Sequence, residues 1–231
     1  KEFDRLSTTV VNSYVGPVFG AYLENLERRL AVFTNSGDVL IMQSNGGVAP
    51  IADSRLHAVR AILSGPAGGV NGAASYGRLV GESKIIAFDM GGTSTDISLI
   101  ENSEPYMSNE KFEGGWKIAV PMIDIHTMGA GGGSIASVGP GGIMQVGPDS
   151  AGADPGPACY GKGGIQPTVT DANLVLGYLD SNNFLGGNSI LHRDKAVAAI
   201  NTHLSIPLGL SMVDAAAGVS QLVSTAIAEG I

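Results

Sequence analysis

A short polar segment between two apolar runs is the feature that most limits how this chain can fold. Residues 84–88 (Lys-Ile-Ile-Ala-Phe) and residues 94–100 both have the composition of strands, and residues 89–93 (Asp-Met-Gly-Gly-Thr) lie between them. Two strands joined by a glycine-containing turn predict a β-hairpin. The chain is therefore expected to contain a tight strand-turn-strand unit with a polar, glycine-rich tip.

The tip of this hairpin has the composition of an anion-binding loop. Gly91 and Gly92 can turn their N–H groups toward an anion, because glycine has no Cβ to block a close approach. Hydroxyl groups follow directly, on Thr93, Ser94 and Thr95. The sequence predicts that this segment binds phosphate. The alternative is a tight turn closed by its own side-chain hydrogen bonds, without a ligand.

Two carboxylates, Asp89 and Asp96, stand at the ends of the turn. Each would repel a bare phosphate. They fit a phosphate loop if a divalent cation or its bound water lies between, or if one of them orients a water molecule for attack. We therefore predict a catalytic role for Asp89 or Asp96, as a partner of the cation or of the attacking group.

A second glycine run predicts a further phosphate contact. Glycine supplies 34 of the 231 residues, about twice its average share, and it shows no Gly-X-Y period that would indicate collagen. A glycine run can open a helix N-terminus onto phosphate. The residues predicted to lie near the ligand are Gly131, Gly132, Gly133 and Ser134. The alternative is a flexible or close-packed turn.

Asp124 and His126 form a candidate metal site. Residues two apart in a strand point to the same face, so these two could bind a divalent metal such as Zn²⁺ or act as an acid–base pair. Zn²⁺ would need a third ligand, which Cys159 or Asp154 could supply. The alternative is a buried histidine bonded to its neighbouring carboxylate. For Cys159 itself, a small packed side chain is favoured over a catalytic thiol, which would need His126 or Lys162 beside it.

The rest of the chain mixes helical and strand patterns, which predicts an α/β or α+β fold rather than a parallel repeat. Apolar residues at helical spacing run through residues 10–30, where Gly16-Pro17 is expected to start a second helix. Further helices are predicted at 52–63, at 66–77 with Pro66 first, at 171–179 capped by Thr170 or Asp171, at 193–204, and after Ser211, which forms a capping-box-like start with Asp214. Strands are predicted at 39–42 and within 116–125.

Composition excludes several classes of function. The formal net charge is −8 and no basic cluster is present, which argues against nucleic acid and anionic membranes as partners. The single cysteine fits a reducing compartment, the cytoplasm, and the sequence has no transmembrane run or signal peptide. The chain lacks an initiator Met and ends within an apolar helical pattern. We therefore expect a domain of a longer protein, whose apolar surface other parts cover.

Several strings resemble one known family. The strand ending in Asp89, the Gly-Gly-Thr turn and the second strand resemble the phosphate hairpins of the actin, hexokinase and heat-shock chaperone ATPase superfamily. More narrowly, the chain resembles the hydantoinase A and 5-oxoprolinase family, which includes N-methylhydantoinase A and subunits of acetone and acetophenone carboxylases. The matching strings are residues 41–47 (IMQSNGG), 63–69 (LSGPAGG), 88–96 (FDMGGTSTD), 128–135 (MGAGGGSI), 146–161 (VGPDSAGADPGPACYG) and 167–173 (PTVTDAN).

The resemblance implies a fold. It predicts an α/β lobe with a mixed sheet, of the actin/hexokinase/heat-shock ATPase type (ribonuclease H-like), with a glycine-rich inserted subdomain at residues 105–205. Residues 1–231 would form the central hydantoinase A-type domain, without the N-terminal lobe and its earlier Gly-Gly-Thr hairpin and without the later adenosine-contacting segment. The hairpin at Asp89 would be the second phosphate loop, and we expect this segment alone to be inactive.

The resemblance also implies an activity, the ATP-dependent opening of a cyclic amide such as hydantoin, N-methylhydantoin or 5-oxoproline through phosphorylation of its carbonyl oxygen. ATP and Mg²⁺ would be required, a second divalent metal such as Zn²⁺ is left open, and a hydantoinase B-type subunit or domain would be the partner. Two alternatives remain. One is an ATP-dependent carboxylase subunit of the acetone or acetophenone type, and the other is a non-catalytic nucleotide-binding module.

Overall fold

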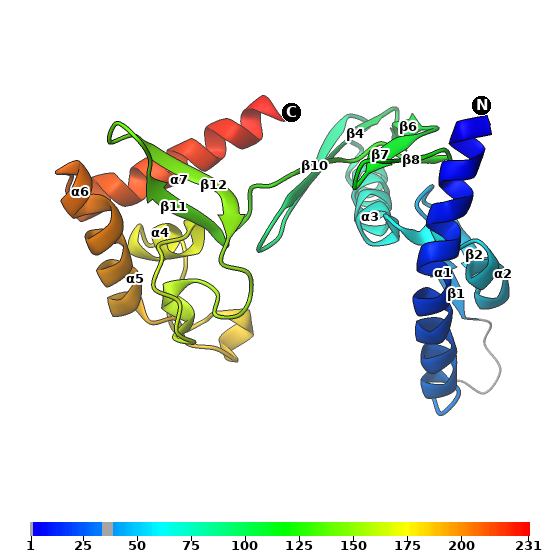
Figure 1. Ribbon diagram of the computed structural model, residues 1–231, viewed down its shortest axis with the longest axis horizontal. Coiled ribbons are helices and arrows are strands. Elements are labelled where there is room, and N and C mark those ends of the chain that lie inside the picture. The colour runs from blue at the N-terminus through cyan, green and yellow to red at the C-terminus, as the bar shows by residue number, and fades with distance from the viewer. Residues whose placement is uncertain (1, 34–38) are drawn as a thin grey trace. The chain divides into compact units, whose positions relative to one another are not determined.

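The computed structural model describes residues 2–33 and 39–231. Its contacts divide the chain into two compact units. The first unit comprises Lys1–Ala87 and Ser98–Ile125, and the second comprises Phe88–Ile97 and His126–Ile231. In Figure 1, the first unit is coloured from blue to green, and most of the second from green to red.

The first unit combines helices with short antiparallel strand pairs. Its helices are α1 (Glu2–Leu30), α2 (Ile51–Leu56), a 3₁₀ helix (Ala58–Ala61) and α3 (Ser64–Val80). Its short strands are β1 (Leu40–Met42), β2 (Val48–Pro50), β5 (Glu104–Pro105), β6 (Met107–Ser108), β7 (Lys111–Glu113), β8 (Trp116–Ile118) and β9 (Met122–Ile123). β1 pairs with β2, β6 with β9 and β7 with β8.

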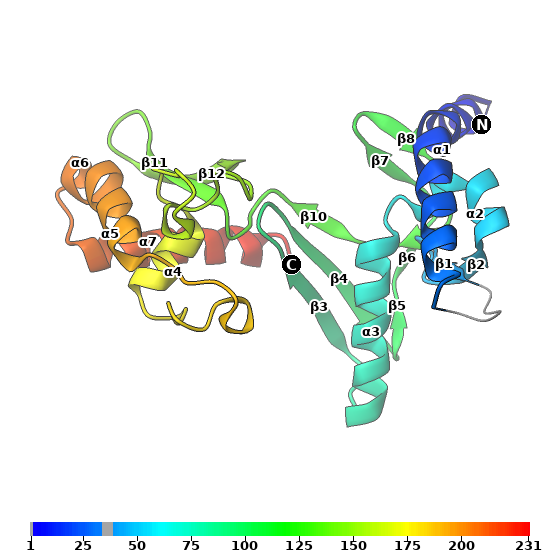
Figure 2. The ribbon, with the colours of Figure 1, turned by 90° about the horizontal axis from the view of Figure 1, so that it is seen from below.

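A four-stranded sheet contains the predicted hairpin. β3 (Ile85–Met90) and β4 (Thr95–Glu101) are neighbours, β10 (His126–Met128) lies on the other side of β4, and β5 pairs with the end of β4. Figure 2 shows β3 and β4 running side by side, with α3 next to them. The hairpin expected from the sequence is therefore confirmed.

Helix α3, which is rich in glycine and alanine, packs closely against its neighbours. The buried face of α3 is made of Ala67, Val70, Ala74 and Gly77. A Cβ on Gly77 would lie 2.8 Å from the carbonyl oxygen of Glu82, so glycine is required where the helix turns toward β3. Pro66 occupies the first turn of α3 but not its first position, because the helix begins at Ser64.

The predicted break in the first helix is wrong. α1 continues through Pro17, which stands in its interior. Proline removes the hydrogen bond to the carbonyl four residues earlier, that of Ser13. Ser13 and Pro17 are both exposed, so water can satisfy this carbonyl. The single helix predicted at 52–63 is interrupted in the structure. It is divided at His57 into α2 and the following 3₁₀ helix.

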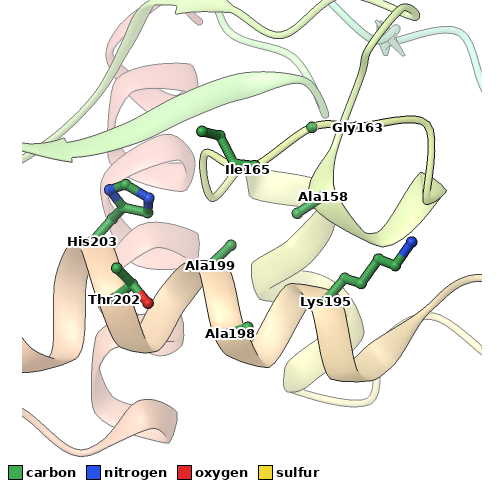
Figure 3. A pocket seen from close by; sticks show the side chains of 9 residues that line it. Ala158, Gly163, Ile165, Lys195, Ala198, Ala199, Thr202 and His203 are labelled. Atoms are coloured by element: carbon green, nitrogen blue, oxygen red, sulfur yellow. The ribbon is translucent and has the colours of Figure 1, made fainter.

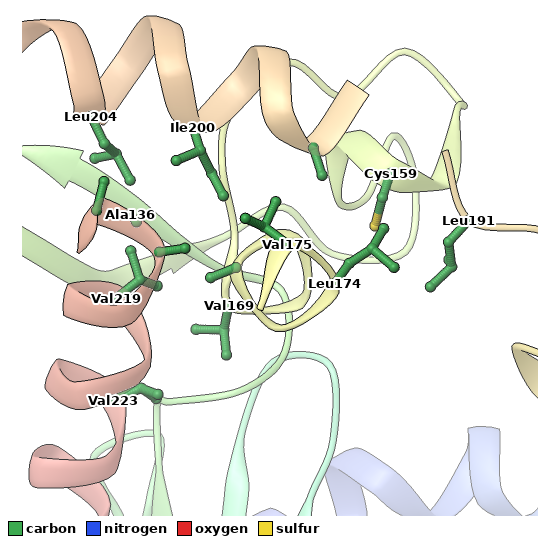
Figure 4. Packing of buried hydrophobic residues seen from close by; sticks show 14 residues of the cluster. Ala136, Cys159, Val169, Leu174, Val175, Leu191, Ile200, Leu204, Val219 and Val223 are labelled. Atoms are coloured by element: carbon green, nitrogen blue, oxygen red, sulfur yellow. The ribbon is translucent and has the colours of Figure 1, made fainter. Parts of the chain in front are cut away.

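The second unit packs helices against a two-stranded ladder. It contains β11 (Ser134–Val138), β12 (Met144–Ser150), a 3₁₀ helix (Ala158–Tyr160), α4 (Val169–Val175), a 3₁₀ helix (Leu185–Gly187), α5 (Arg193–Ile200), a π-helix (Asn201–Ser205), α6 (Ile206–Leu208) and α7 (Met212–Glu229). In its core, α4 presents Val169 and Val175 between α5 and α7 (Figure 4). These residues pack against Ile200 of α5 and Val219 of α7.

Two helix starts in this unit test the capping predictions. Ser211 caps α7, and its Oγ accepts a hydrogen bond from the N–H of Asp214, as predicted. The predicted cap of α4 is wrong by two or three residues. Thr168 is the cap, and Asp171 is the third helical residue, whose carboxylate completes a reciprocal capping box.

The compact units do not coincide with the inserted subdomain expected at residues 105–205, which stays a prediction. Among the described residues, no single helix is long and apolar enough to cross a membrane. The segments Arg193–Leu208 and Met212–Glu229, which are bent relative to each other, reach the length and composition of a membrane span only when they are taken together.

Candidate functional site

The tip of the hairpin is a tight turn, with one carboxylate, Asp89, before it and another, Asp96, after it. The N–H of Gly91 donates to the carbonyl of Ser94 over 2.8 Å, which closes the turn around Gly92 and Thr93. Gly91, Gly92 and Thr93 are exposed. The register that this bond sets puts Asp89 of β3 opposite Asp96 of β4, so both carboxylates stand on one face of the sheet.

The second glycine run packs directly against this turn. The N–H of Gly132 donates to the carbonyl of Gly91 (2.9 Å), and the N–H of Gly133 donates to that of Gly92 (2.6 Å). A Cβ on Gly131 would lie 2.7 Å from the backbone nitrogen of Thr93. Glycine is therefore needed here for close approach of two backbones.

This arrangement corrects one expectation. The run does not open a helix, because the chain continues from Ser134 into strand β11. The N–H groups of Gly132 and Gly133 already donate to the hairpin, so they form part of its support. The Oγ of Ser134 accepts from the N–H of Gly131 and is buried, which gives this side chain a structural role as well.

The same contacts direct the N–H groups at the tip. Peptides 91–92 and 92–93 are trans, so each N–H points opposite to the carbonyl of its own peptide. Because the carbonyls of Gly91 and Gly92 point at the second glycine run, the N–H groups of Gly92 and Thr93 point away from it. Neither N–H has a hydrogen-bond partner in the described part of the chain. Successive N–H groups that face one side form an anion-binding nest.

A hydroxyl group flanks the carboxylate pair. Thr127 lies opposite Asp96 in the ladder of β10 and β4, and its Oγ1 donates to Asp96 Oδ1 over 2.7 Å. Asp89, Asp96 and Thr127 therefore form a row across three strands beside the turn. Like charges directly opposite one another are unfavourable in a sheet. A divalent cation would offset this repulsion, and carboxylate and hydroxyl oxygens suit Mg²⁺.

The remaining hydroxyls of the turn divide into two kinds. Thr95 is fully buried, and its Oγ1 donates to the carbonyl of Ala130, so it holds the two loops together. Thr93 is exposed and Ser94 is partly buried, so neither hydroxyl is enclosed as that of Thr95 is.

Sequence reasoning missed the support behind the second glycine run. The N–H and Oγ1 of Thr170 both donate to the carbonyl of Gly132 over 2.8 Å. Next to it, the buried carboxylate of Asp171 accepts from the N–H groups of Ala158, Cys159 and Thr168 and from the Thr168 hydroxyl. The PTVTDAN string contains Thr170 and Asp171, but it does not indicate their contacts with residues 132, 158 and 159.

Cys159 is fully buried, and burial together with the nearby Asp171 carboxylate raises the pKa of its thiol far above the ordinary range. A neutral, enclosed thiol is a poor nucleophile. The small packed side chain favoured by the sequence therefore agrees with the structure, and Cys159 has no part in the candidate site.

The proposed metal pair lacks the strand geometry that suggested it. Asp124 lies between β9 and β10, outside both strands, whereas His126 begins β10. Both side chains are exposed. Across residues 2–33 and 39–231, no three His, Cys, Asp or Glu residues gather in a metal-binding group. Metal binding at Asp124 and His126 stays a prediction.

A separate cavity in the second unit has little polar chemistry. Its volume is about 460 Å³, and it lies between the face of α5 and the loop that contains Gly163 and Ile165. In Figure 3, the labelled residues of α5 and the π-helix that follows it run from Lys195 at one end to His203 at the other, and Ala199 lies between them. Its walls are mainly apolar, and it is not included in the candidate site.

Comparison with known proteins identifies the family. A family model described as Hydantoinase/oxoprolinase matches residues 5–231. The chain therefore belongs to this family, and the resemblance drawn from its motifs is confirmed.

Two relatives and two solved structures illustrate the match. The alpha subunit of caprolactamase from Pseudomonas jessenii is 46% identical over 231 residues, which cover 100% of this chain and 33% of the relative. 5-oxoprolinase 1 from Arabidopsis thaliana is 45% identical over 179 residues, or 77% of this chain and 14% of that protein. This chain spans about a third or less of the length of these relatives.

The crystal structure of ATP-dependent caprolactamase from Pseudomonas jessenii aligns with a TM-score of 0.84 at 45% identity, covering 100% of this chain and 33% of that one. A nucleotide-free structure of acetone carboxylase also gives 0.84, at 35% identity over 97% of this chain and 32% of that one. These neighbours have the actin-like ATPase-type fold, so the predicted fold class is confirmed.

Proposed function

We propose that the protein containing this chain uses ATP to open a small cyclic amide, and that the β3–β4 turn holds a phosphate group of the nucleotide. One observation carries the proposal: the N–H groups of Gly92 and Thr93 point the same way and have no partner in the described part of the chain. Membership of the Hydantoinase/oxoprolinase family supports it, as do the names of the relatives, a caprolactamase and a 5-oxoprolinase.

The chemistry explains why ATP would be needed. Resonance makes the carbonyl carbon of a ring amide a poor electrophile. Transfer of the γ-phosphoryl group to the carbonyl oxygen forms a C–O–P linkage and releases ADP. Water then attacks the activated carbon, and the C–N bond breaks with proton transfer to nitrogen, which leaves an acyl phosphate. A second water hydrolyses the acyl phosphate, which releases phosphate and gives the ring-opened amino acid. The protein contributes positioning and electrostatic stabilisation.

Each part of the turn has a task in this scheme. The N–H groups of Gly92 and Thr93 bind phosphate oxygens. Asp89 and Asp96 hold Mg²⁺ or its water ligands, and Thr127 orients the Asp96 carboxylate. Mg²⁺ would neutralise charge on the phosphate oxygens.

An ATP-dependent carboxylase subunit is the second candidate, because acetone carboxylase aligns with the same TM-score as caprolactamase. The higher identity to caprolactamase, 45% against 35%, favours the cyclic amide. A non-catalytic nucleotide-binding module would keep the turn, but its ATP turnover would not respond to any substrate.

A partner is part of the proposal. One side of α1 exposes a row of large apolar residues at helical spacing: Phe3, Leu6, Val10, Tyr14, Val18 and Tyr22. Such a surface normally contacts another segment or subunit. The named relatives include an alpha subunit, which supports a hydantoinase B-type partner subunit or domain. We further propose that these 231 residues alone are inactive and that the protein acts in the cytoplasm.

The deciding experiment is an ATP turnover assay of the complete protein with its co-purified partner. Hydantoin, 5-oxoproline, caprolactam and acetone with bicarbonate are compared. We expect one of the cyclic amides to stimulate ADP release and to yield the ring-opened amino acid in a 1:1 ratio. Stimulation by acetone and bicarbonate alone would support the carboxylase, and turnover that ignores every substrate would support the binding module.

A further inference from the structure

Each N–H group assigned to phosphate lies at the end of a path of hydrogen-bonded peptide groups. In the first path, the carbonyl of Gly132 accepts from Thr170, and the N–H of Gly133 belongs to the same peptide group as that carbonyl. This N–H donates to the carbonyl of Gly92 over 2.6 Å. The peptide group of Gly92 carries the N–H of Thr93 at its other end. The first path therefore runs from Thr170 through two peptide groups to the N–H of Thr93.

The second path consists of backbone groups. The N–H of Ser134 donates to the carbonyl of Gly131 over 3.0 Å. The N–H of Gly132 belongs to the same peptide group as that carbonyl, and it donates to the carbonyl of Gly91 over 2.9 Å. The peptide group of Gly91 ends in the N–H of Gly92. Both proposed phosphate donors are thus backed by peptide groups of the second glycine run.

Thr170 begins the first path with two donors on one carbonyl. Its N–H and its Oγ1 each lie 2.8 Å from the carbonyl oxygen of Gly132, and the residue is only 8% exposed, so water competes little for these bonds. Within residues 2–33 and 39–231, the Thr170 hydroxyl is the one side-chain donor to either path. Thr170→Val can therefore remove one bond at the start of the first path and leave every backbone bond in place.

The start of α4 is held in place, so Thr170 can act as a fixed point for the loop. The buried carboxylate of Asp171 accepts from the N–H of Cys159 over 2.8 Å. On the other side of Thr170, the carbonyl of Pro167 accepts from the N–H of Ala136 over 2.8 Å. These bonds tie the residues around Thr170 to the preceding 3₁₀ helix and to β11.

Each bond in such a path acts on the next one. A peptide group that accepts a hydrogen bond at its carbonyl is polarised and becomes a better donor at its N–H, with a strengthening of about 10–30% per bond. The peptide groups of both paths are trans, so the carbonyl and the N–H of each group point in opposite directions. Fixing one end of a group therefore also directs its other end.

We infer that Thr170 is a positioning residue for the β3–β4 turn, and that its hydroxyl, acting through the first path, directs and strengthens the N–H of Thr93 toward a bound phosphate. The inference rests on the proposed function, because the N–H of Thr93 is one of the two groups assigned to phosphate there. It adds to that site a side chain that does not touch the nucleotide.

The test separates nucleotide affinity from turnover in the complete protein. The dissociation constant of the Mg²⁺ complex of β,γ-methylene-ATP, which keeps three phosphate groups but resists hydrolysis, is measured by isothermal titration calorimetry. Thr170→Val should raise this constant, and KM for ATP, by about three- to tenfold. It should leave kcat within about twofold, because a contact made equally before and during the reaction affects binding alone. Thr170→Ser, which keeps the hydroxyl, should restore both values to within about twofold of the unmodified protein.

Ser7→Ala is the matched control for loss of a buried hydroxyl. Ser7 is 3% exposed in the first unit, and its Oγ donates to the carbonyl of Lys117 over 2.7 Å. This substitution removes the same kind of bond as Thr170→Val, so it should lower the Tm by a similar small amount and leave the dissociation constant unchanged. Equal dissociation constants in Thr170→Val and Ser7→Ala, or no restoration by Thr170→Ser, would overturn the positioning role.

A second readout needs no nucleotide. In protein labelled with ¹⁵N-threonine, the amide proton of Thr93 should move to lower frequency in Thr170→Val, because its peptide group is less polarised. Ser7→Ala should leave this resonance in place. Its assignment follows from its disappearance in Thr93→Ser. A Thr93 resonance that stays unmoved in Thr170→Val would contradict transmission along the first path.

Failure of this inference and failure of the proposed function are distinguishable. Nucleotide binding that Thr170→Val leaves unchanged would refute the positioning role alone. A Thr93 resonance that moves in Thr170→Val, in a protein that binds no nucleotide, would support transmission along the first path and refute the proposed function.

Discussion

A Gly131→Ala substitution tests whether the two glycine segments must interlock to form the site. The new Cβ would lie 2.7 Å from the nitrogen and carbonyl carbon of Thr93 and from the carbonyl carbon of Gly92. All three are backbone atoms, so relief requires movement of the turn itself. Ordinary carbon contacts are about 3.5–4.0 Å, so the turn and the loop must separate by about 1 Å.

Two measurable effects follow from this separation. Overpacking of this kind costs about 1–3 kcal/mol of the free energy of unfolding. In a domain of this size, that corresponds to a Tm lower by about 2–12 °C. A misplacement of about 1 Å in a catalytic loop lowers the rate by about 100-fold, so kcat for ATP turnover should fall by roughly that factor.

The assay compares three alanine variants of the complete protein by thermal unfolding and ATP turnover. Gly129→Ala is the matched control, because its Cβ would meet nothing within 4 Å, and it should behave as the unmodified protein. Gly92→Ala also has open space around its Cβ, so it should keep the Tm. Its ATP turnover should fall, since the methyl group would stand beside the proposed phosphate site. If Gly131→Ala retained both the Tm and the turnover of Gly129→Ala, the reasoning about the interlock would be refuted.

Three other predictions concern charge and burial in the second unit. Asp89→Asn should reduce ATP turnover at least about 100-fold and, since Asp89 is exposed, should leave the Tm within about 2 °C. Asp149→Asn, an exposed control on β12, should change neither the turnover nor the Tm. Normal turnover in Asp89→Asn would exclude the carboxylate role. Asp171→Asn should lower the free energy of unfolding by about 3–5 kcal/mol, because an amide NH₂ would face the N–H donors that the carboxylate now accepts, and a Tm unchanged in differential scanning calorimetry would contradict this. Burial raises the pKa of the Cys159 thiol above its ordinary value near 9. The contribution of the neutral thiol to the free energy of unfolding is therefore fully present below pH 9. It is lost as the pH rises further, because only the unfolded thiol then ionises. Urea unfolding between pH 8 and 10 should show this decline, which Cys159→Ala should reduce; rapid labelling of the native thiol by iodoacetamide at pH 8 would argue against its burial.

Local sequence was sufficient to predict the hairpin that carries the candidate site. Two apolar runs and a Gly-Gly turn give a hairpin because strand composition and glycine's backbone freedom act within a few residues. The Ser211 cap of α7 was predictable for the same reason, since the donor and acceptor are three residues apart. Local reasoning failed at the cap of α4, because Thr168 caps the helix and the Asp171 carboxylate accepts from Ala158 and Cys159 as well as from Thr168.

The tertiary structure decided which groups of the site are free to act. From the sequence alone, the glycines of the second run were candidates for phosphate contact after those of the turn. Their pairing across about 40 residues occupies the N–H groups of Gly132 and Gly133 and directs those of Gly92 and Thr93 outward. The bond from Thr127 to Asp96 depends in the same way on the register of β10 against β4. Hydrogen-bond partners so distant in sequence are chosen by packing, which no local preference encodes.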